Sequence, residues 1–438
     1  ILVKMKRITT RLLVAPSKKG QSMIDSLILV IGGIAVILVW KQCYMLWKKR
    51  YGPSTPYLLL WKPLQNQWYP YYRISYIKPN ADRSLKITQL RLTPRNNPHS
   101  KTYLVYFPSC STLQSIGKNL TIKPNHNDRV YFFRACYCRQ IHSKLANYSY
   151  LTAYYGSQQK IMPISYRLDH FNDYSRFQSK YKENQLLTQQ HPYQHPQKWL
   201  VKLDIDQKRG LYLYHTLDKT TLQQLSKQPA LIQLLQPDPL LINGYRSSFR
   251  FYLAIHCQSD GRQQLYLYSD GLVQYSMLPY DPASDDLSSL LAGYPASQST
   301  LKHYIKNRLP RSYQQLLSQY NNPKASLPSY QTLLNFFQTV FRPFRSHMCE
   351  CKTDSSIGGL HHRVHVYGAD VGFHLDRGSY RPYLYELNTG PQQVYQETDR
   401  QNLILTMYRG LFQCIGILPK NNHSTHSMTS NNWIPIAN

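Results

Sequence analysis

Acidic residues are scarce in this chain, whose 438 residues include 22 Asp and Glu against 52 Lys and Arg, a net charge of +30. A field of this sign favours acidic partners: nucleic acid, an anionic membrane surface or an acidic peptide. The sequence also lacks an Arg/Gly-rich tail, zinc-finger spacing and an RNA-recognition aromatic motif. Only the charge therefore supports nucleic acid as the partner, and we expect an acidic protein instead.

Standard zinc motifs are absent although the chain has eight cysteines. The closest pairs have one residue between their members, where the usual zinc knuckle has two: Cys136/Cys138 and Cys349/Cys351. Three histidines near the second pair could complete a metal site: His361, His362 and His365. Because the spacing is wrong for zinc, we expect free thiols in a reducing compartment.

Long hydrophobic runs are absent except near the N-terminus, where Leu27–Trp40 is continuously apolar. Counted from Ser22 to Trp47, the segment is long enough to cross a bilayer. Basic and aromatic residues follow it, where a signal peptide would have a small-residue cleavage site. We therefore predict a single-pass membrane anchor over residues 23–47, in preference to a signal peptide or a buried core helix.

The orientation of this anchor depends on where translation starts. From Met23, only Asp25 precedes the span and three basic residues, 48–50, follow it, which predicts that the bulk of the chain is cytoplasmic. If residues 1–22 are translated, their six basic side chains compete for the same side. That acid-free, basic segment also resembles a mitochondrial presequence, so the mitochondrial inner membrane is the alternative location.

Two short strands joined by a turn are expected in Val366–Pro391, VYGADVGFHLDRGSYRPYLYELNTGP. Residues two apart on a strand point to the same face, so Glu386 and Asn388 project together, and Asp370 lies opposite them if the strands pair. Three oxygen-bearing side chains on one face suit Mg²⁺, which commonly shares its ligands with nucleotide phosphates. The alternative is that these acids are simply solvated.

Cationic and apolar segments elsewhere complete a nucleotide site. Lys202, at the strand end in KWLVKLDI, precedes a Gly-containing turn and can hold phosphates together with backbone N–H groups. The apolar segment Leu231–Leu235 could present its backbone to an adenine edge. Arg246 and Arg250 lie four apart in YRSSFRFYL and add fixed positive charge. Together these segments predict an ATP site between two sheets, although each alone is an ordinary surface feature.

The order of these segments resembles the tubulin–tyrosine ligase family of ATP-grasp ligases, from about Phe132 to Ile417. The segments HSKLANYSYLTAYYG and IMPISYRLDHFNDYSRF resemble the family's Lys-containing helix and its "P-x-T-y-x-L-P" stretch. WLVKLDIDQKRGLYL resembles "W-I-x-K-P-…-R-G-x-G-I", and IQLLQPDPLLINGYRSSFRFYLAI resembles "Q-x-Y-i-x-x-P-L-L-i-x-G-x-K-F-D-l-R-x-Y-v". LYLYSDGLVQYSMLPYDP resembles "l-Y-l-y-r-x-G-x-v-R-f-a-x-x-P-Y". YGADVGFHLDRGSYRPYLYELNTGP resembles "G-x-D-…-l-k-P-w-L-l-E-v-N-x-x-P".

The resemblance implies a fold of the mixed α+β or α/β class, the ATP-grasp fold, in which two α+β subdomains sandwich ATP. It implies ATP and Mg²⁺ as cofactors. Four residues would bind the nucleotide: Lys144, Lys202 and Arg246 at the phosphate side, and Gln233 in the adenine hinge. Two would be catalytic: Glu386, and Arg250 facing the acceptor carboxylate and acyl-phosphate. The Mg²⁺ ligands would be Asp370, Glu386 and Asn388.

Composition and the resemblance together divide the chain into segments. The expected segments are 1–22, a basic N-terminal segment; 23–47, the anchor; 48–70, a linker; 71–135, a small N-terminal α/β domain; 136–418, the ATP-grasp catalytic domain; and 419–438, a disordered tail. Within the catalytic domain, Arg250–Cys257, Gln264–Ser269 and Leu272–Met277 are expected to form a meander. Its second turn would lie at Asp270-Gly271.

Several positions depart from the family pattern. Arg246 replaces the Lys of "K-F-D-l-R", which keeps the charge but changes the shape. Ser248 replaces its Asp, and Ser269 replaces the Arg of "Y-r-x-G", so we expect both on the wall opposite the metal ligands. Leu234 stands for the adenine-side Lys and Leu203 for the Pro after the strand-end Lys. The His-Leu-Thr-Asn box of the family is not visible.

The resemblance and the basic charge lead to one principal hypothesis. The chain would be a membrane-anchored ligase that adds a free amino acid to a carboxylate of an acidic protein, such as the tail of tubulin, through an acyl-phosphate. The alternative is a catalytically weakened relative that binds tubulin or another polyanion as a membrane-tethered adaptor. Neither the amino acid nor the acceptor follows from the sequence.

Overall fold

The computed structural model describes part of the chain, and every described residue lies in one of two units, residues 60–438. The described residues are 72–77, 88–94, 101–106, 128–133, 144–156, 160–190, 197–203, 210–293, 309–320, 325–345, 349, 360–389, 398–418 and 432–436. The predicted basic segment, membrane anchor and linker lie outside them, so the anchor stays a prediction. Within the described residues, no helix is long and apolar enough to cross a membrane.

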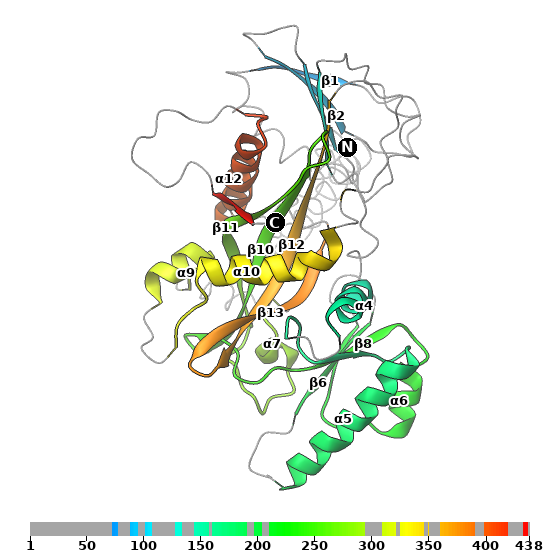
Figure 1. Ribbon diagram of the computed structural model, residues 1–438. Coiled ribbons are helices and arrows are strands. Elements are labelled where there is room, and N and C mark those ends of the chain that lie inside the picture. Colours follow the sequence, from blue (N-terminus) through cyan, green and yellow to red (C-terminus); the bar gives the residue numbers. More distant parts are fainter. Residues whose placement is uncertain are drawn as a thin grey trace, which may run out of the picture. The chain divides into compact units, whose positions relative to one another are not determined.

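The larger of two sheets in the described residues has ten strands (Figure 1). Its main path runs β1-β2-β3-β4-β12-β10-β11-β14, while β13 pairs with β12 and β9 with β10. The strands are β1 (Tyr72–Ile77), β2 (Thr88–Pro94), β3 (Thr102–Tyr106), β4 (Arg129–Phe133), β9 (Leu241–Ile242), β10 (Tyr245–Cys257), β11 (Gln263–Tyr275), β12 (Leu360–Asp376), β13 (Ser379–Asn388) and β14 (Trp433–Ile436).

The smaller sheet has four antiparallel strands in the order β5-β8-β6-β7. They are β5 (Ser165–Arg167), β6 (Trp199–Leu203), β7 (Leu211–Tyr214) and β8 (Ala230–Leu234). The helices of the structure are α4 (Lys144–Tyr155), α5 (Phe171–Gln190), α6 (Lys219–Leu225), α7 (Leu287–Leu290), α9 (Tyr313–Gln319), α10 (Tyr330–Phe341), the 3₁₀ helix η4 (Arg342–Phe344) and α12 (Thr398–Cys414). The expected mixed α+β fold with two sheets is confirmed, and it is consistent with an ATP-grasp fold.

Strand β12 joins the N-terminal strands to the rest of the larger sheet. Its first residues, 360–364, run parallel to β4, and its other edge pairs antiparallel with β10. The strands expected to form a separate small domain at 71–135 therefore continue the larger sheet instead. A physical reason lies in β4, RVYFF, whose last four residues are all buried and so need cover on both faces.

The hairpin expected in Val366–Pro391 is confirmed as β12 and β13. Its two-residue turn, Arg377-Gly378, has φ of 51° and 81°, and Asn243-Gly244 between β9 and β10 has φ of 52° and 82°. Both residues at positive φ are typical of the tight turn whose twist matches that of paired strands. Glycine at the second position avoids the steric cost that a side chain would meet there.

The expected meander is wrong at its second turn. β11 continues through Asp270-Gly271, because Phe251 pairs with Gly271 while Leu253 pairs with Leu267, which leaves an irregularity in β11 instead of a chain reversal. Asp270 accepts hydrogen bonds from the backbone N–H of Gly271 and of Gln314 in α9. A turn-like dipeptide here marks a bulge, and β10 and β11 form one long hairpin.

The expected disordered tail is also wrong in part. Within 419–438, Trp433–Ile436 forms β14 and pairs antiparallel with β11. The Trp433 side chain is 2% exposed, and its Nε1 donates to the Met407 carbonyl of α12. Two large apolar side chains in this polar segment, Trp433 and Ile436, provide enough buried area to order it.

The core of the larger sheet lies under α10. Apolar side chains of β10 and β12, such as Phe249, Phe251 and Phe373, pack against Phe337 and Phe341 of that helix. α10 begins at a Ser329 cap, whose hydroxyl accepts from the Thr332 N–H. Because side chains alternate along a strand, the polar residues between these phenylalanines point to the opposite face.

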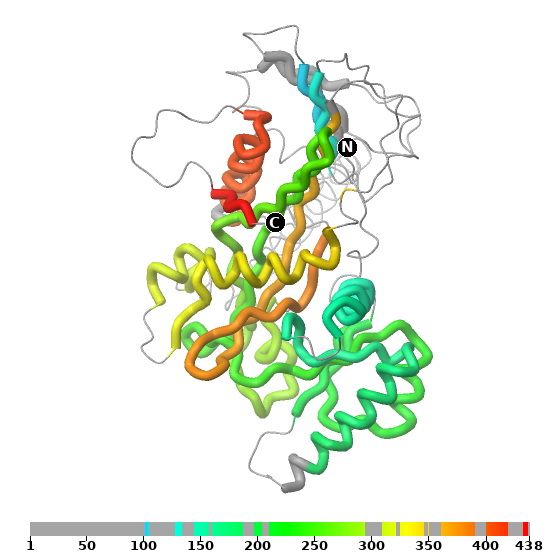
Figure 2. Tube along the Cα trace, in the orientation of Figure 1, coloured from blue at the N-terminus to red at the C-terminus, as the bar shows by residue number. Residues whose placement is uncertain are grey.

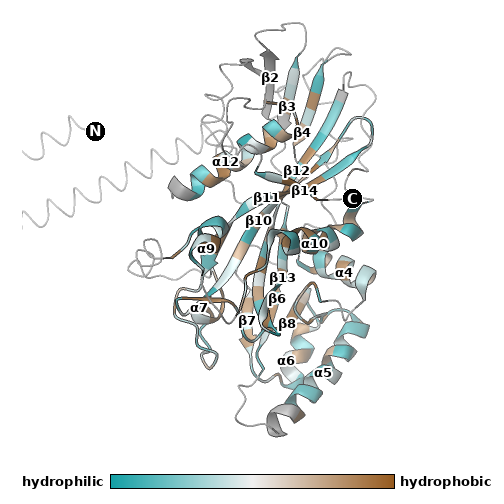
Figure 3. Cartoon of the chain, turned by 60° about the vertical axis from the view of Figure 1, so that its left-hand side comes forward, coloured by the Kyte–Doolittle hydropathy of each residue, from teal (hydrophilic) through white to brown (hydrophobic). Residues whose placement is uncertain are grey.

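Helices α5 and α6 cover one face of the smaller sheet (Figure 2). Phe177 and Tyr181 of α5 and Leu222 of α6 pack on Trp199 and Ile232. Most of the rest of α5 is hydrophilic, as its colouring in Figure 3 shows, although Phe171 and Leu186 are exposed on it. Residues 185–190, which are rich in glutamine, form the end of this helix.

Candidate nucleotide-binding and metal-binding site

A pocket of about 380 Å³ lies between the two sheets. All eight residues that the sequence predicted for the site line it: Lys144, Lys202, Gln233, Arg246, Arg250, Asp370, Glu386 and Asn388. They come from α4, from β6 and β8 of the smaller sheet, and from β10, β12 and β13 of the larger one. The structure therefore brings together residues spread over about 240 positions of sequence.

The predicted Mg²⁺ ligands share one face of the β12–β13 hairpin. Asp370 pairs directly with Glu386, and Gly368 pairs with Asn388. The intervening Leu387 is 2% exposed and points to the core. The predicted register of the three oxygen-bearing side chains is thus confirmed, whereas their role in binding Mg²⁺ stays a prediction.

Asp370 holds an arginine in this structure. Arg250 donates from Nε to Oδ1 at 2.8 Å and from Nη2 to Oδ2 at 2.6 Å. Asn388 Nδ2 donates to the same Oδ2 at 3.3 Å. Arg250 and Asp370 lie directly opposite each other on β10 and β12, which explains the two-point geometry.

Glu386 differs from Asp370. It is partly buried, and no described residue forms a hydrogen bond or an ion pair with its carboxylate. Burial, and then the charge of Asp370, raise the pKa of its carboxyl above the ordinary value. An incompletely solvated carboxylate without a partner is costly, so the position suits a cation. With the Asp370 carboxylate and the Asn388 amide nearby, the donor set fits Mg²⁺.

Lys202 is buried at the opposite side of the pocket, with 9% of its surface exposed. Its Nζ donates to Oε1 of Gln233 at 2.6 Å, and Gln233 Nε2 donates to the Ser165 hydroxyl at 2.8 Å. Burial lowers the pKa of Lys202 from 10.5 to about 8, because no described carboxylate forms a salt bridge with the ammonium. Gln233, expected at the adenine hinge, thus holds Lys202 through its amide oxygen and is itself held by Ser165 through its amide nitrogen.

Arg246 is the second buried cation of the pocket, with 3% of its surface exposed. Nη2 donates to the Tyr385 hydroxyl at 3.3 Å, and the guanidinium lies 6.0 Å from the centre of the Tyr280 ring. Nη1 is buried and has no hydrogen-bond partner among the described residues. A buried donor without an acceptor points to a ligand that supplies one, so Arg246 and Lys202 fit the phosphates of a nucleotide.

The two serines that replace charged residues of the family lie in different places. Ser248 lines the pocket on β10, opposite Gln274 of β11, as expected for a position that lost a carboxylate. Ser269 does not line it, and its carbonyl accepts hydrogen bonds from Gln314 and Tyr330 at the α9–α10 side of β11. The expectation that Ser269 belongs to the pocket wall is therefore wrong, because the β11 irregularity separates it from Gln274.

Sequence reasoning missed three contributors to the site. Tyr385 lines the pocket and contacts Arg246 and Lys202, Ser165 supports Gln233, and Gln274 faces Ser248. Tyr385 directly precedes Glu386 in the sequence, but regular strand alternation would assign its side chain to the face away from Glu386. No sequence pattern indicated that Ser165 or Gln274 would contribute to the site.

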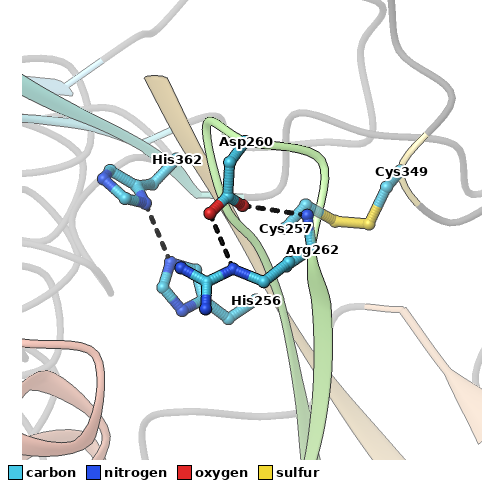
Figure 4. The surroundings of a disulfide bond; sticks show 6 residues. All are labelled: His256, Cys257, Asp260, Arg262, Cys349 and His362. Carbon is cyan, nitrogen blue, oxygen red and sulfur yellow. Dashed lines mark hydrogen bonds and ion pairs between the residues drawn. A yellow bond between two sulfur atoms is a disulfide. The ribbon is translucent and has the colours of Figure 1, made fainter. Parts of the chain in front are cut away.

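The histidines and cysteines gather at the other end of β10 and β12 (Figure 4). Cys257 forms a disulfide with Cys349, with their Cα atoms 5.8 Å apart, so the expectation of free thiols is wrong for this pair. His256 Nε2 lies 3.1 Å from His362 Nδ1. The described residues contain no group of three or more potential metal ligands. The remaining cysteines of the two close pairs, Cys136, Cys138 and Cys351, lie outside those residues.

Comparison with known protein families identifies the chain. The model of the Tubulin-tyrosine ligase family matches residues 121–425, and the chain therefore belongs to this family. Members of the family are in general ATP-dependent ligases that use Mg²⁺ and add an amino acid to a protein substrate such as tubulin. A comparison with curated proteins gave no match.

Proposed function

We propose that this chain joins an amino acid to a carboxylate of an acidic protein, with ATP as the co-substrate. An oxygen of the acceptor carboxylate attacks the γ-phosphorus, and ADP leaves. The amine of the amino acid then attacks the acyl carbon of the resulting acyl-phosphate, phosphate leaves with the bonding electron pair, and the nitrogen loses a proton. Neither step needs a nucleophilic side chain of the protein, so positioning and charge neutralisation are its main tasks.

The observation that carries this proposal is the separation of charge within one pocket. Two buried cations, Lys202 and Arg246, lie where no described carboxylate pairs with them, while the Glu386 carboxylate at the hairpin has no partner among the described residues. An anion with a bound divalent cation would satisfy both sets of groups at once. MgATP has this composition.

Each wall of the pocket has a separate role in the proposal. Lys144, Lys202 and Arg246 bind phosphate oxygens, while Gln233 holds the Lys202 ammonium in place. Leu234, Leu235 and Gln236 line the pocket directly after Gln233 and form the wall proposed to contact the adenine. When bound, Mg²⁺ would neutralise phosphate charge during transfer, held by Glu386, Asp370 and Asn388.

Arg250 has two uses in this scheme. In the structure it neutralises Asp370, and at the pocket surface it can face the acceptor carboxylate. The excess of positive charge over the whole chain favours an acidic acceptor through long-range attraction. Tubulin is the acceptor that family membership suggests first.

The proposal is tested by incorporation of radiolabelled amino acids into tubulin by the purified full chain with MgATP. We expect label incorporation by the unaltered chain and a loss of roughly 100-fold or more in Glu386→Gln, which removes a charge aimed at the metal. Glu183→Gln, an acid-to-amide change on exposed α5, is the matched control and keeps the activity. Equal incorporation by Glu386→Gln and the unaltered chain contradicts the proposed role of this carboxylate.

A second candidate function is supported by the Arg250–Asp370 ion pair and by Ser248. The ion pair occupies a proposed metal ligand, and Ser248 stands where the family has a carboxylate. A relative weakened in this way would bind tubulin or another polyanion without modifying it, tethered by the predicted N-terminal anchor. Tubulin binding by a chain that shows neither label incorporation nor heat of MgATP binding in calorimetry would support this candidate over the ligase.

A further inference from the structure

The Arg246 side chain is 3% exposed, and only part of its guanidinium has a hydrogen-bond partner among the described residues. One nitrogen, Nη2, donates to the Tyr385 hydroxyl, while Nη1 has no partner in the described residues. A long, flexible side chain binds a ligand well only when its own conformation is restricted beforehand. The groups that restrict Arg246 therefore contribute to the site as much as its charge does.

The Tyr385 hydroxyl is the centre of a directed chain of hydrogen bonds. The Pro237 carbonyl can only accept, so the Nδ1 of His374, 3.2 Å away, carries the proton. Nε2 of the neutral ring is then an acceptor, and the Tyr385 hydroxyl donates to it at 2.6 Å. The lone pairs of the same oxygen remain for the Arg246 donor. Each of these three hydrogen bonds therefore has a fixed donor and a fixed acceptor.

The charge state of His374 agrees with this direction. Its side chain is 3% exposed, and burial, followed by the nearby positive charge of Arg246, lowers its pKa from 6.5 to about 3. The imidazole is therefore neutral at ordinary pH. A protonated ring would donate at both nitrogens and could not accept from tyrosine.

The backbone explains how Tyr385 reaches this position. The β12–β13 register shifts after Asp370, because Asp370 pairs with Glu386 while Val371 pairs with Leu384. Tyr385 is the extra residue, and the bulge turns its side chain toward the pocket face beside Glu386. Without the bulge, strand alternation would send the side chain to the core face.

Gly372 makes room for the tyrosine. A Cβ built on Gly372 would lie 2.0 Å from the Tyr385 hydroxyl oxygen and 2.3 Å from Cζ. No real contact is this short, so any side chain at position 372 would displace the ring. The bulge, the glycine and the histidine together fix one position for the hydroxyl.

The pocket departs from the family pattern at both ends of this contact. Arg246 stands where the pattern has Lys, and Tyr385 stands where "P-w-L-l-E-v-N" has an aliphatic residue. Arginine presents a planar fork and needs an acceptor to hold its orientation, whereas a lysine ammonium is a point charge. The two departures thus fit each other physically.

We propose that Tyr385, supported by His374 and by the space above Gly372, is a positioning residue that aims the Arg246 guanidinium at an anionic group of the bound nucleotide. The inference deepens the proposed function and rests on it. The relay also ends at Pro237, one residue after the pocket-lining segment Leu234–Gln236, so it fixes Arg246 relative to the proposed adenine side.

The test is a double-mutant cycle on MgATP affinity, measured by calorimetry with the full chain. We expect Tyr385→Phe to weaken binding about tenfold and Arg246→Ala about 30- to 100-fold, from the loss of charge-assisted bonds. Because Tyr385 acts through Arg246, the double variant should bind within about twofold of Arg246→Ala. If the loss of affinity in the double variant equals the product of the two single losses, Tyr385 acts independently of Arg246, which overturns the inference.

Two further variants separate positioning from general stability. Gly372→Ala displaces the ring without removing any polar group, so it should weaken MgATP binding to about the level of Tyr385→Phe. Tyr383→Phe is the matched control, because it removes a hydroxyl from the same strand and keeps the ring that contacts His374. Binding is measured well below the melting midpoint of each variant, and Tyr383→Phe should match the unaltered chain.

The pair exchange Arg246→Lys with Tyr385→Leu restores what the family pattern has at both positions. We expect it to bind MgATP within about twofold of Arg246→Lys alone, since a lysine ammonium needs no acceptor at that place and Tyr385 acts through Arg246. A failure of the unaltered chain to bind MgATP refutes both the proposed function and the inference. If the unaltered chain binds MgATP and Tyr385→Phe binds it with the same affinity, the inference is refuted while the proposed function stands.

Discussion

The two ends of the β10–β12 strand pair differ in whether their side chains have bonding partners among the described residues. At the pocket end, Arg246 Nη1 and the Glu386 carboxylate on the neighbouring β13 lack described partners. At the far end, His256 bonds to His362, and Cys257 is joined to Cys349 (Figure 4). One end leaves buried polar groups for something else to satisfy, and the other satisfies them within the chain.

This difference separates a binding site from a structural one. A buried polar group without a partner costs on the order of 1–3 kcal/mol, and a fold keeps such groups where a ligand repays the cost. A buried pair that is already satisfied gains nothing from a ligand. The comparison therefore supports the proposal that the pocket end binds a ligand and that the far end contributes to stability.

Breaking the disulfide should give the largest effect on stability. Cys257 and Cys349 are 92 residues apart in sequence, so reduction frees a long loop in the unfolded chain and should lower the free energy of unfolding by about 2–4 kcal/mol. Urea unfolding of the same protein with and without a thiol reductant measures this. The double variant Cys257→Ala with Cys349→Ala controls for other thiols, and reductant should not destabilise it further.

The affinity for MgATP tests whether the pocket end is independent of the disulfide. Because the disulfide lies at the far end of β10, reduction should change the dissociation constant by less than about twofold at temperatures where the protein stays folded. A large loss of nucleotide affinity on reduction would show that the two ends are coupled, and the division of roles would be wrong.

The buried charge of Lys202 should give the next largest effect, a change of stability with pH. The direction of this change follows from the difference between the folded and unfolded pKa values. The folded pKa, about 8, lies below the ordinary value of 10.5, so the unfolded chain binds more protons between these values. Stability therefore rises with pH from about 8 to 10 as the buried ammonium loses its proton, by up to about 3 kcal/mol.

Lys202→Met tests this assignment, because it fills the same space without a charge. We expect the variant to be more stable than the unaltered chain at pH 7, to lose that advantage near pH 10, and to bind MgATP at least tenfold more weakly. Unfolding midpoints measured across this range decide the point. A variant that is less stable at pH 7 would mean that the ammonium is satisfied within the chain.

The histidine pair should give the smallest effect. Burial lowers the pKa of His256 and of His362 from 6.5 to about 4 each. The unfolded chain then binds more protons between pH 4 and 6.5, so this part of the stability is lost as the pH falls through that window. Since His362 is partly exposed and stacks on Tyr131, we expect His362→Phe to remove about 1 kcal/mol of this dependence.

The measurement for this pair is the slope of the unfolding free energy against pH between 4 and 6.5. His374 also has a lowered pKa and remains in both proteins, so only the difference between them reports the pair. Identical slopes would mean that His362 does not contribute to the pH dependence.

Much of the candidate site could be predicted from the sequence, because its chemistry lies in short-range patterns. The spacing of Glu386 and Asn388 indicated one strand face, and Asp370 was correctly placed opposite them before the turn. Lys202 at a strand end and the arginines four apart on β10 also lie in the pocket as expected. Each of these depends only on strand periodicity and on the order of blocks.

Other features could not be predicted, since they depend on contacts between distant segments or on local irregularities. Strand periodicity misplaced Tyr385, because one extra residue in β13 reverses its direction. Ser269 was assigned to the pocket on the basis of the family pattern, but the β11 irregularity removes it. Cys257 and Cys349 were expected to be free, since no local signal joins residues so far apart.

The sequence by itself determined the composition of the site: scarce carboxylates concentrated at one hairpin, cations at strand ends, and the blocks that resemble a ligase family. These follow from residue type and spacing, which any chain expresses locally. Only the tertiary structure decided which of these groups are satisfied, since that depends on the register between strands and on burial. In the structure, Asp370 forms an ion pair with Arg250, and Gln233 accepts a hydrogen bond from Lys202. The tertiary structure left Glu386 and one nitrogen of Arg246 without a partner in the described residues, and that difference supports the proposed binding site.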